Sequence, residues 1–477
     1  MSLIISSDMY DVVKQPIRDM SIKIELLNFS YQTIGEITGN TISGNISEDA
    51  NADIRRTCSL SLVVTDSSFN IEPGSKFWLD RYMKIYVGIN NIKTGKIVWM
   101  NQGIYLIDAP SWKYDATNNT LTIAGLDLMA KLTGARGGYL PASGYKIPAG
   151  SNIKSVMTAL LTQFTTFTNY AIVDNPQTVP LDMEFEQGVT VYEILAELRD
   201  LYPSWEIFFD IDGVFRYQEI PNGQNDEILS EDGAIIADDD LWNDIVIDEA
   251  VDVSFQDVKN VIYVYGSSRD PKYYGAASLS GNTYTSQISN VSAYTNGTIY
   301  GFTVSAISPY DALYYQVNSL GSRRVVLSDG SFAKITENNE YYCVMYRSAT
   351  NDFLFLGHLQ AKAIARDENP DSPFYIGNPA GEIIAVKYGG DYDNIQSDEL
   401  AQERANYELW LATRFNDNVT FSCAPVYWLK TNNLITFTDR TSNTTNQYII
   451  KDISTDLSVG GKQTIKAIKY YPLYPDI

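Results

Sequence analysis

Alternation of apolar and polar residues dominates both ends of the chain. In the first part it occurs in CSLSLVV (58–64), MKIYVGI (83–89), GIYLIDAPSWKY (103–114) and TLTIAG (120–125). Turn-forming residues follow these runs at Thr65-Asp66, Lys93 to Lys96 and Asp115 to Asn119. Successive side chains of a strand point to opposite faces, so such runs predict strands with one buried face. We expect an antiparallel sandwich or barrel over residues 20–132, and strands again over 419–471.

The apolar period changes to that of a helix in three places. SNIKSVMTALLTQF (151–164) places its apolar residues on one helical stripe. A second helix is predicted from Thr190, whose side chain and that of Glu193 form a capping box, and Pro203 is expected to end it. The third helix is SDELAQERANYELWLATRF (397–415), which Ser397 is expected to cap.

Residues 205–221, WEIFFDIDGVFRYQEIP, pose a choice between a calcium site and a turn. A calcium loop that starts at Asp210 would have Asp212 at its third position. Its fifth and sixth positions, however, would be Val214 and Phe215, where an oxygen ligand and a glycine are needed. The flanking residues are also strand-like. A two-residue turn at Asp212-Gly213 fits better, with Ile211 paired with Val214 and Phe208 opposite Tyr217.

Residues 226–257 are strongly acidic. They contain twelve Asp or Glu and no Lys or Arg, with isolated apolar residues such as Trp242. A run of like charges is usually solvated, so a solvated connector is the favoured interpretation. A cation site at Asp238, Asp239 and Asp240 is the alternative.

Composition narrows the function classes. A chain of 477 residues is too long for one core and predicts two to four domains. The 34 Tyr and 18 Phe favour strands. With 58 acidic and 35 basic residues the net charge is −23. Such a surface repels polyanions, so tight binding to nucleic acid or to an anionic membrane is excluded.

Three cysteines, Cys58, Cys343 and Cys423, lie far apart and form no CxxC motif, so we expect reduced, buried thiols and no zinc site. The N-terminus, MSLIISSDMYDVV, has no basic segment and only a short apolar stretch. A cleaved signal peptide is therefore not expected. No apolar run approaches the roughly 20 residues of a membrane span, so we expect no membrane insertion.

Catalytic motifs are scarce. The single histidine, His358, lies in FLFLGHLQAK, and any Ser-His-Asp or Cys-His site would have to use it. A partly buried structural histidine is the simpler interpretation, and no HExxH motif is present. Lysozyme-like chemistry needs only two carboxylates, but no pair is marked among the acids. We therefore predict a protein that is not an enzyme, with no catalytic, cofactor-binding or metal-binding residue and no cofactor.

Two segments far apart in sequence share a pattern. YLIDAPSWKYDATNNTLTIAG starts at Tyr105, and YIIKDISTDLSVGGKQTIKAI starts at Tyr448. Each has an apolar triplet, a polar turn and a return strand that begins with Thr-Ile, at Thr122 and Thr464. A duplicated module and a chance similarity between two hairpins both explain the match.

Along the chain, VYEILAELRDLYPSW is followed by EIFFDIDGVFRYQEIP, then by the acidic segment, and then by NVIYVYG. This order of elements resembles that of bacteriophage tail hub proteins, also called baseplate hub or late-control-type proteins. Hubs from phages and prophages of Gram-positive bacteria are also similar to IRRTCSLSLVVTD (54–66), GEIIAVKYGGDYDNIQSDELAQERANYELWLATR (381–414) and KYYPLYPD (469–476). The similarity spans most of the chain and is weakest over 267–380.

This resemblance implies a mainly β fold with two tube-like antiparallel β-barrel domains, a small α+β domain and an inserted β-rich subdomain. The expected segments are 1–135 (first barrel), 136–245 (α+β domain), 246–380 (start of the second barrel and inserted subdomain) and 381–477 (helix and remainder of the second barrel). It also implies a homotrimer whose six barrels adapt a sixfold tube to a threefold tip.

The implied location is the virion, at the tail tip or baseplate, after synthesis in the host cytoplasm. The implied partners are the tail tube or distal tail protein, a tail fibre, spike or lysin, and the tape measure protein. DNA would pass through the lumen without specific binding, and we expect many acidic residues to line that lumen. The alternative function is that of a secreted β-rich carbohydrate-binding protein or a cell-wall glycosidase.

Overall fold

The structure is a computed structural model of the chain. It describes residues 3–470 apart from 39–40, 64–70, 76, 80, 115–118, 142–143, 176–177, 180–181, 203–204, 221–227, 254–255, 257, 414–416 and 459. Four expected features lie wholly or partly outside the described residues: the turns at Thr65-Asp66 and Asp115 to Asn119, the helix end at Pro203 and the closing segment KYYPLYPD.

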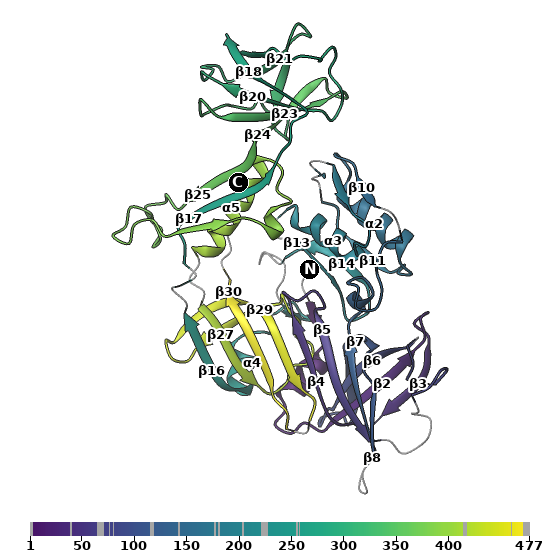
Figure 1. The fold of residues 1–477 in the computed structure, drawn as a ribbon. Coiled ribbons are helices and arrows are strands. Elements are labelled where there is room, and N and C mark those ends of the chain that lie inside the picture. The colour runs from purple at the N-terminus through teal and green to yellow at the C-terminus, as the bar shows by residue number, and fades with distance from the viewer. Residues whose placement is uncertain are drawn as a thin grey trace.

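Thirteen strands form one antiparallel sheet at the base of the molecule (Figure 1). Eleven follow one another in the order β16 (Val246–Val253), β27 (Asp417–Cys423), β30 (Gln463–Lys469), β29 (Thr444–Asp456), β4 (Thr41–Asp49), β5 (Arg56–Val63), β9 (Asn119–Leu126), β7 (Ile97–Ile107), β6 (Tyr82–Asn90), β2 (Met20–Leu27) and β3 (Thr33–Thr38). The other two are β28 (Leu434–Asp439), which pairs with β29, and β8 (Ser111–Tyr114), which pairs with β9. The mainly β class is confirmed, and the two ends of the chain share one open sheet.

The same strand order occurs twice in this sheet. The first group is β4-β5-β9-β7-β6, and the second is β16-β27-β30-β29-β28. The matching strands are β4 and β16, β5 and β27, β6 and β28, β7 and β29, and β9 and β30. These pairs also occur in the same order along the chain. The hairpins that begin near Tyr105 and Tyr448 occupy matching places, and the pair β29–β4 joins the two groups edge to edge.

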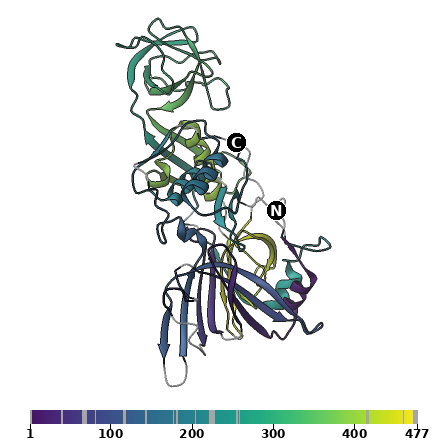
Figure 2. The ribbon, with the colours of Figure 1, turned by 90° about the vertical axis from the view of Figure 1, so that its right-hand side faces the viewer.

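Two helices cover one face of the large sheet (Figure 2). They are α1 (Ser7–Lys14), capped by Ser6, and α4 (Asp239–Ile245), capped by Asp238. Their buried side chains share a core with both strand groups. Short strands precede both helices and pair in parallel, β1 (Leu3–Ile5) with β15 (Ile228–Ser230).

The acidic segment 226–257 is not the solvated connector that its charge predicts. Its described part contains β15, α4 and β16. Trp242 is only 1% exposed, and its indole N–H donates to the Thr436 carbonyl oxygen at 2.8 Å. Leu241 and Ile245 are buried beside it. Apolar residues at helical spacing therefore bring the segment into the core, while most of its acidic side chains face solvent.

The α+β region follows the first strand group. It contains the short helix η2 (Leu128–Lys131), α2 (Ile153–Phe164), α3 (Val191–Asp200), the pair β10 (Tyr145–Ile147) and β12 (Met183–Phe185), and a sheet of β11 (Tyr170–Ile172), β14 (Phe215–Glu219) and β13 (Trp205–Phe209). The capping box of Thr190 and Glu193 is present, as predicted. This region, called the insert below, packs its core on Leu27, Tyr82 and Leu106 of the large sheet.

The hairpin between β13 and β14 is confirmed, but its register differs from the prediction by one residue. Phe208 lies opposite Arg216, and Ile207 takes the place opposite Tyr217. The Gly213 N–H donates to the Asp210 carbonyl oxygen at 3.0 Å, and Gly213 has a φ of 75°. Asp212 does not share this left-handed conformation. The connection is therefore a three-residue loop that ends in a left-handed glycine, not a two-residue turn.

The segment 258–413 rises above the base (Figure 1). A sheet of β25 (Gln360–Arg366), β17 (Val261–Ser268) and β26 (Ile384–Lys387) packs on α5 (Asp398–Ala412), after the short helix η3 (Gly390–Tyr392). Ser397 caps α5, as predicted. Between β17 and β25 the chain forms a closed barrel of β18 (Tyr273–Ser280), β19 (Thr283–Ser286), β20 (Ile299–Val304), β21 (Tyr314–Val317), β22 (Arg323–Val326), β23 (Tyr341–Arg347) and β24 (Asp352–His358).

Aromatic side chains fill this small barrel. Tyr284, Tyr300, Phe302, Tyr315 and Phe353 are each fully buried. Phe302 stacks on Tyr315, with ring centroids 4.4 Å apart. The barrel therefore has its own core, separate from the core of the large sheet. No helix in the described part of the chain is both long enough and apolar enough to span a membrane.

Candidate functional site on the polar face of the large sheet

The face of the large sheet opposite α1 and α4 is lined by small polar side chains. They alternate along each strand with the buried residues of the core. Residues directly opposite each other on neighbouring strands lie on the same face. The residues of this face are therefore found by following the strand partners across the sheet. The set comprises Asn45, Ser47, Thr57, Ser59, Ser61, Thr120, Thr122, Asn418, Thr420, Ser422, Ser454 and Thr464. All are half-buried or exposed, and we call this surface the polar face.

The charges on the polar face are mainly negative. Asp49, Asp248, Asp252, Asp452 and Asp456 occupy positions in this pairing pattern, and among the same described strands Lys466 is the basic residue. Asp49 lies directly opposite Asp452. Burial, opposed by Lys466 and reinforced by Asp49, raises the pKa of Asp452 above its ordinary value. The face therefore concentrates negative charge at the joint between the two strand groups.

That joint, β29–β4, is tied by polar contacts on both sides of the sheet. On the polar face, Asn45 donates to the Ser454 hydroxyl at 3.1 Å. On the core side, the Glu48 carboxylate accepts hydrogen bonds from the Thr431 backbone N–H at 3.2 Å and from its hydroxyl at 2.6 Å. Main-chain pairing runs from Asn45 to Asp49. The joint is thus a continuous part of the sheet.

The insert is fixed to this joint through its hairpin. The Glu206 carboxylate accepts hydrogen bonds from Arg55 at 2.7 Å and from Asn432 at 2.6 Å. Arg56 donates to the carbonyl oxygens of Phe209 and Asp210 at 2.6 and 2.7 Å. Strand β5, the hairpin and the residues before β28 therefore meet in one buried polar cluster. Sequence reasoning did not find this cluster, because its members are up to several hundred residues apart.

The two aspartates of the hairpin make hydrogen bonds and ion pairs that hold its loop in place. The Asp210 carboxylate accepts from the backbone N–H groups of Asp212 and Val214 and pairs with Arg216 at 2.6 Å. Asp212 accepts from Asn101 at 2.9 Å and pairs with Lys84 at 3.3 Å. The loop is thereby docked on β6 and β7.

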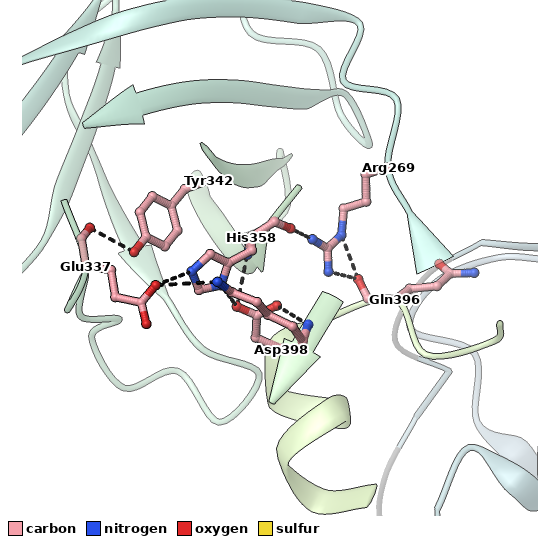
Figure 3. A network of polar contacts seen from close by, with 7 residues as sticks. Arg269, Glu337, Tyr342, His358, Gln396 and Asp398 are labelled. Carbon is pink, nitrogen blue, oxygen red and sulfur yellow. Dashed lines mark hydrogen bonds and ion pairs between the residues drawn. The ribbon is translucent and has the colours of Figure 1, made fainter. Parts of the chain in front are cut away.

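The single histidine lies at the neck between the small barrel and the sheet beneath it (Figure 3). His358 Nδ1 and its backbone N–H both contact the Asp398 carboxylate, at 2.5 and 2.9 Å, and Nε2 lies 3.3 Å from Glu337. Arg269 donates to the carbonyl oxygens of His358 and Gln396. Burial lowers the pKa of Arg269 from its ordinary value. These contacts join the barrel to the start of α5.

Within the described residues, Glu337, Glu340 and His358 are close enough to hold a metal ion, with ligand atoms within 4.8 Å of one another. Glu337 is exposed and also lies 3.4 Å from Lys362. The histidine can thus be explained by the neck contacts alone. The expected structural role of His358 stays a prediction.

The other expected candidates have structural contacts. Asp238 caps α4 by accepting from the Asp240 N–H, and Asp239 accepts from the Thr438 N–H at 3.0 Å. The three cysteines are buried free thiols, and burial raises the pKa of Cys58 and Cys423 to about 12 and that of Cys343 to about 11. The polar face was not predicted residue by residue, although its Ser and Thr alternate visibly with apolar residues in CSLSLVV.

Comparison with known sequences gives one family match and no function. Residues 371–474 match a family described as a domain of unknown function, DUF5048. No curated protein matches the chain. The family match covers less than half of the chain and assigns no activity.

Comparison with solved structures gives the fold. The 43 kDa tail protein of prophage MuSo2 from Shewanella oneidensis is 12% identical, with a TM-score of 0.51, over 94% of this chain and 98% of that one. The tail protein from Neisseria meningitidis MC58 is 9% identical, with a TM-score of 0.50, over the same shares. Prophage tail protein gp18 from Listeria monocytogenes EGD-e is 9% identical over 94% of both chains, with a TM-score of 0.43. The chain has the fold of the first two tail proteins.

Proposed function

We propose that this chain is a structural protein of a phage or prophage tail, and that three copies form the hub at its distal end. The observation that carries the proposal is the repeated strand group, joined edge to edge in one sheet that has a polar, acidic face. Two groups in each of three copies supply six modules. Such a ring matches a sixfold tube on one side and a threefold tip on the other.

In this proposal the domains of each copy are the segments 1–135, 136–245, 246–380 and 381–477. The first and last supply most of the two strand groups, together with β16 from the third. The insert stabilises the joint between them through Glu206. The small barrel rises away from the large sheet and is the part best placed to meet further tail proteins (Figure 1).

In the ring the polar face lines the lumen. Hydroxyl and amide side chains carry no charge. They neutralise no DNA phosphates, so counterion release does not favour binding of DNA to this face. The aspartates repel phosphate over about 8 Å at physiological salt. A genome can then slide through without being bound.

The remaining assignments follow from a hub role. The partners are the tail tube or distal tail protein, a fibre, spike or lysin, and the tape measure protein inside the ring. The site of action is the tail tip or baseplate of the virion, after synthesis in the host cytoplasm. The role needs no catalytic residue and no cofactor. The sequence resemblance favours a phage or prophage of Gram-positive bacteria.

Charge reversal on the polar face tests the lumen assignment. We expect the native ring not to be retained on duplex DNA at physiological salt. The variant Asp49→Lys, Asp252→Lys, Asp456→Lys should be retained, because its lumen would then attract phosphate. A matched control carries the same change in net charge on and next to the small barrel, as Asp270→Lys, Asp311→Lys, Asp329→Lys. Equal retention of the two variants would show that net charge matters and the polar face does not.

A carbohydrate-binding role is the second candidate, and one surface feature favours it. Tyr274 and Tyr341 lie on the outside of the small barrel, 44% and 47% exposed, with their rings stacked at 5.5 Å. Exposed aromatic rings are surfaces on which sugars stack. Glycan-array binding that is lost in Tyr274→Ala, by a chain that stays monomeric, would favour this role over the hub.

A further inference from the structure

Four described strands of the large sheet, β3, β8, β16 and β28, pair on one side only. Two of them, β8 and β16, pair with residues of the polar face. Among the described strands, β16 pairs with β27 alone and β8 pairs with β9 alone. An open edge offers a row of unpaired N–H and C=O groups to another strand. The question is which strand each edge accepts.

The repeat shows which strand each open edge should accept, because the joint between β4 and β29 is a pair of the same kind within the chain. At that joint the first strand of one group, β4, pairs antiparallel with the second half of β29 in the other group. The strand that matches β4 is β16. The part of the first group that matches the second half of β29 is β8, because both pair with the return strand of their hairpin. The open edges are thus the two counterparts of a pair that the chain already forms.

The repeat also fixes the register of such a pair. Ile46 of β4 lies beside Cys58, which pairs with Gly125, three residues after Thr122. Val251 of β16 lies beside Val419, which pairs with Ala467, three residues after Thr464. Ile46 therefore corresponds to Val251.

The partner strand is matched in the same way. Thr455 of β29 lies opposite Gln463, the residue before Thr464. Trp112 of β8 lies opposite Leu121, the residue before Thr122. Thr455 therefore corresponds to Trp112. Since Ile46 lies opposite Thr455 at the joint, Val251 should lie opposite Trp112.

Burial distinguishes the filled joint from the open edge. Ile46 belongs to the core and is 7% exposed, because β29 covers its strand. Its counterpart Val251 is 37% exposed, and Ile247 on the same strand is 53% exposed. Apolar side chains exposed along an unpaired edge are costly in a soluble subunit and are expected to be covered by a partner.

We propose that β16 of one copy pairs antiparallel with β8 of the next copy, with Val251 opposite Trp112 and Ala250 opposite Lys113. The inference deepens the proposed hub function, on which it depends for the number of copies. The contact is head to tail, so repeating it closes into a ring when the rotation permits. It would make one continuous sheet around the lumen, with the polar face unbroken from copy to copy.

Cysteine cross-linking tests the register in the full-length chain. Val251→Cys with Trp112→Cys and Ala250→Cys with Lys113→Cys place one thiol on each side of the proposed pair. Using both variants guarantees that one of them sits at a non-hydrogen-bonded pair, where the Cβ atoms are closer. The native thiols do not compete, because all three are buried. Under mild oxidation we expect covalent dimers and trimers on non-reducing gels.

The register control is Val251→Cys with Tyr114→Cys, because Tyr114 lies two residues after Trp112 in β8. Its Cα atoms would be too far apart for a disulfide, so cross-linking should fall by ~tenfold. Trimers by light scattering without on-register cross-links would overturn this pairing and leave the hub proposal standing. Monomers at all concentrations would overturn both.

A disruption variant gives an independent readout. Val251→Asp changes an exposed residue, so the subunit should fold while the oligomer dissociates at least about tenfold more readily. The matched control is Val386→Asp, a change at a 52% exposed valine outside the large sheet. If both variants assemble like the native chain, the edge of β16 does not carry the contact.

Discussion

The insert and the small barrel are both attached through charged groups, but the two attachments differ in burial. Below the insert, the side chains of Arg55 and Glu206 are 6% and 7% exposed and lie 2.7 Å apart. At the neck of the barrel, His358 and Asp398 are 14% and 21% exposed, and Glu337, which contacts His358, is 53% exposed. The ion pair below the insert is therefore shielded from solvent, whereas the one at the neck is partly exposed to it.

This difference indicates which part of the molecule is rigid. A charge left alone in a buried site carries its full desolvation cost, whereas water compensates a charge left alone near the surface. The insert and the large sheet should therefore behave as one body. The small barrel should open from its neck at a lower free energy than the base unfolds.

The largest expected effect breaks the buried attachment. Glu206→Ala leaves Arg55 without its carboxylate and Asn432 without its acceptor. We expect the free energy of unfolding to fall by about 3–5 kcal/mol, measured by denaturant titration. Arg55→Met with Glu206→Met removes both charges and should recover much of the loss. If Glu206→Ala lowers the free energy of unfolding by less than about 1 kcal/mol, this ion pair is not shielded from solvent.

The next effect strains the neck. A Cβ added to Gly357 would overlap Cγ of Asp398, so Gly357→Ala must displace the carboxylate that contacts His358. We expect a loss of about 1–3 kcal/mol, seen as faster hydrogen exchange in the barrel but not in the large sheet. Gly281→Ala is the matched control, because Gly281 also has a positive φ (63°) but no atom within 4 Å of an added Cβ. Equal effects would leave backbone strain alone as the cause.

A smaller effect of opposite sign comes from Lys430 beside the buried joint. Burial, together with the positive charge of Arg56, lowers the pKa of Lys430 to about 8, against the opposing influence of Glu48. Protonated Lys430 therefore destabilises the fold fully below pH 8, and the cost disappears as pH rises toward the unfolded value near 10.5. Lys430→Met should add about 1–2 kcal/mol at pH 7 and less at pH 10. A gain independent of pH would contradict this origin.

The smallest effect marks the exposed extreme of the comparison. Lys93 and Asp11 pair at 2.9 Å with side chains 74% and 41% exposed. Lys93→Ala should change the free energy of unfolding by less than about 0.5 kcal/mol, and salt should abolish even that difference. A larger change in denaturant titrations would show that burial does not rank these contacts.

Local chemistry made some elements predictable from the sequence. The capping box at Thr190 and the cap at Ser397 mark helix starts, because their hydrogen bonds depend on residues three positions away. The hairpin at Gly213 was located for the same reason. Its register was missed because a two-residue and a three-residue loop place glycine similarly, and tertiary contacts of Asp212 select the longer one.

Other features depend on distant residues. Trp242 is buried although it lies in an acidic segment, because its ring packs on Phe421 and its indole N–H binds the Thr436 carbonyl oxygen. The pair β29–β4 joins residues about four hundred positions apart, so no local pattern specifies it. The polar face exists only once that pair has formed. The short similarity between Tyr105 and Tyr448 was the one sequence signal that bears on it.

Electron microscopy of the purified oligomer tests the central claim most directly. We predict a threefold ring of three 53.4 kDa chains with an open lumen, lined by the polar strands that carry Asp49, Asp252 and Asp456. A particle without a lumen, or a ring that turns this face outward, would contradict the account.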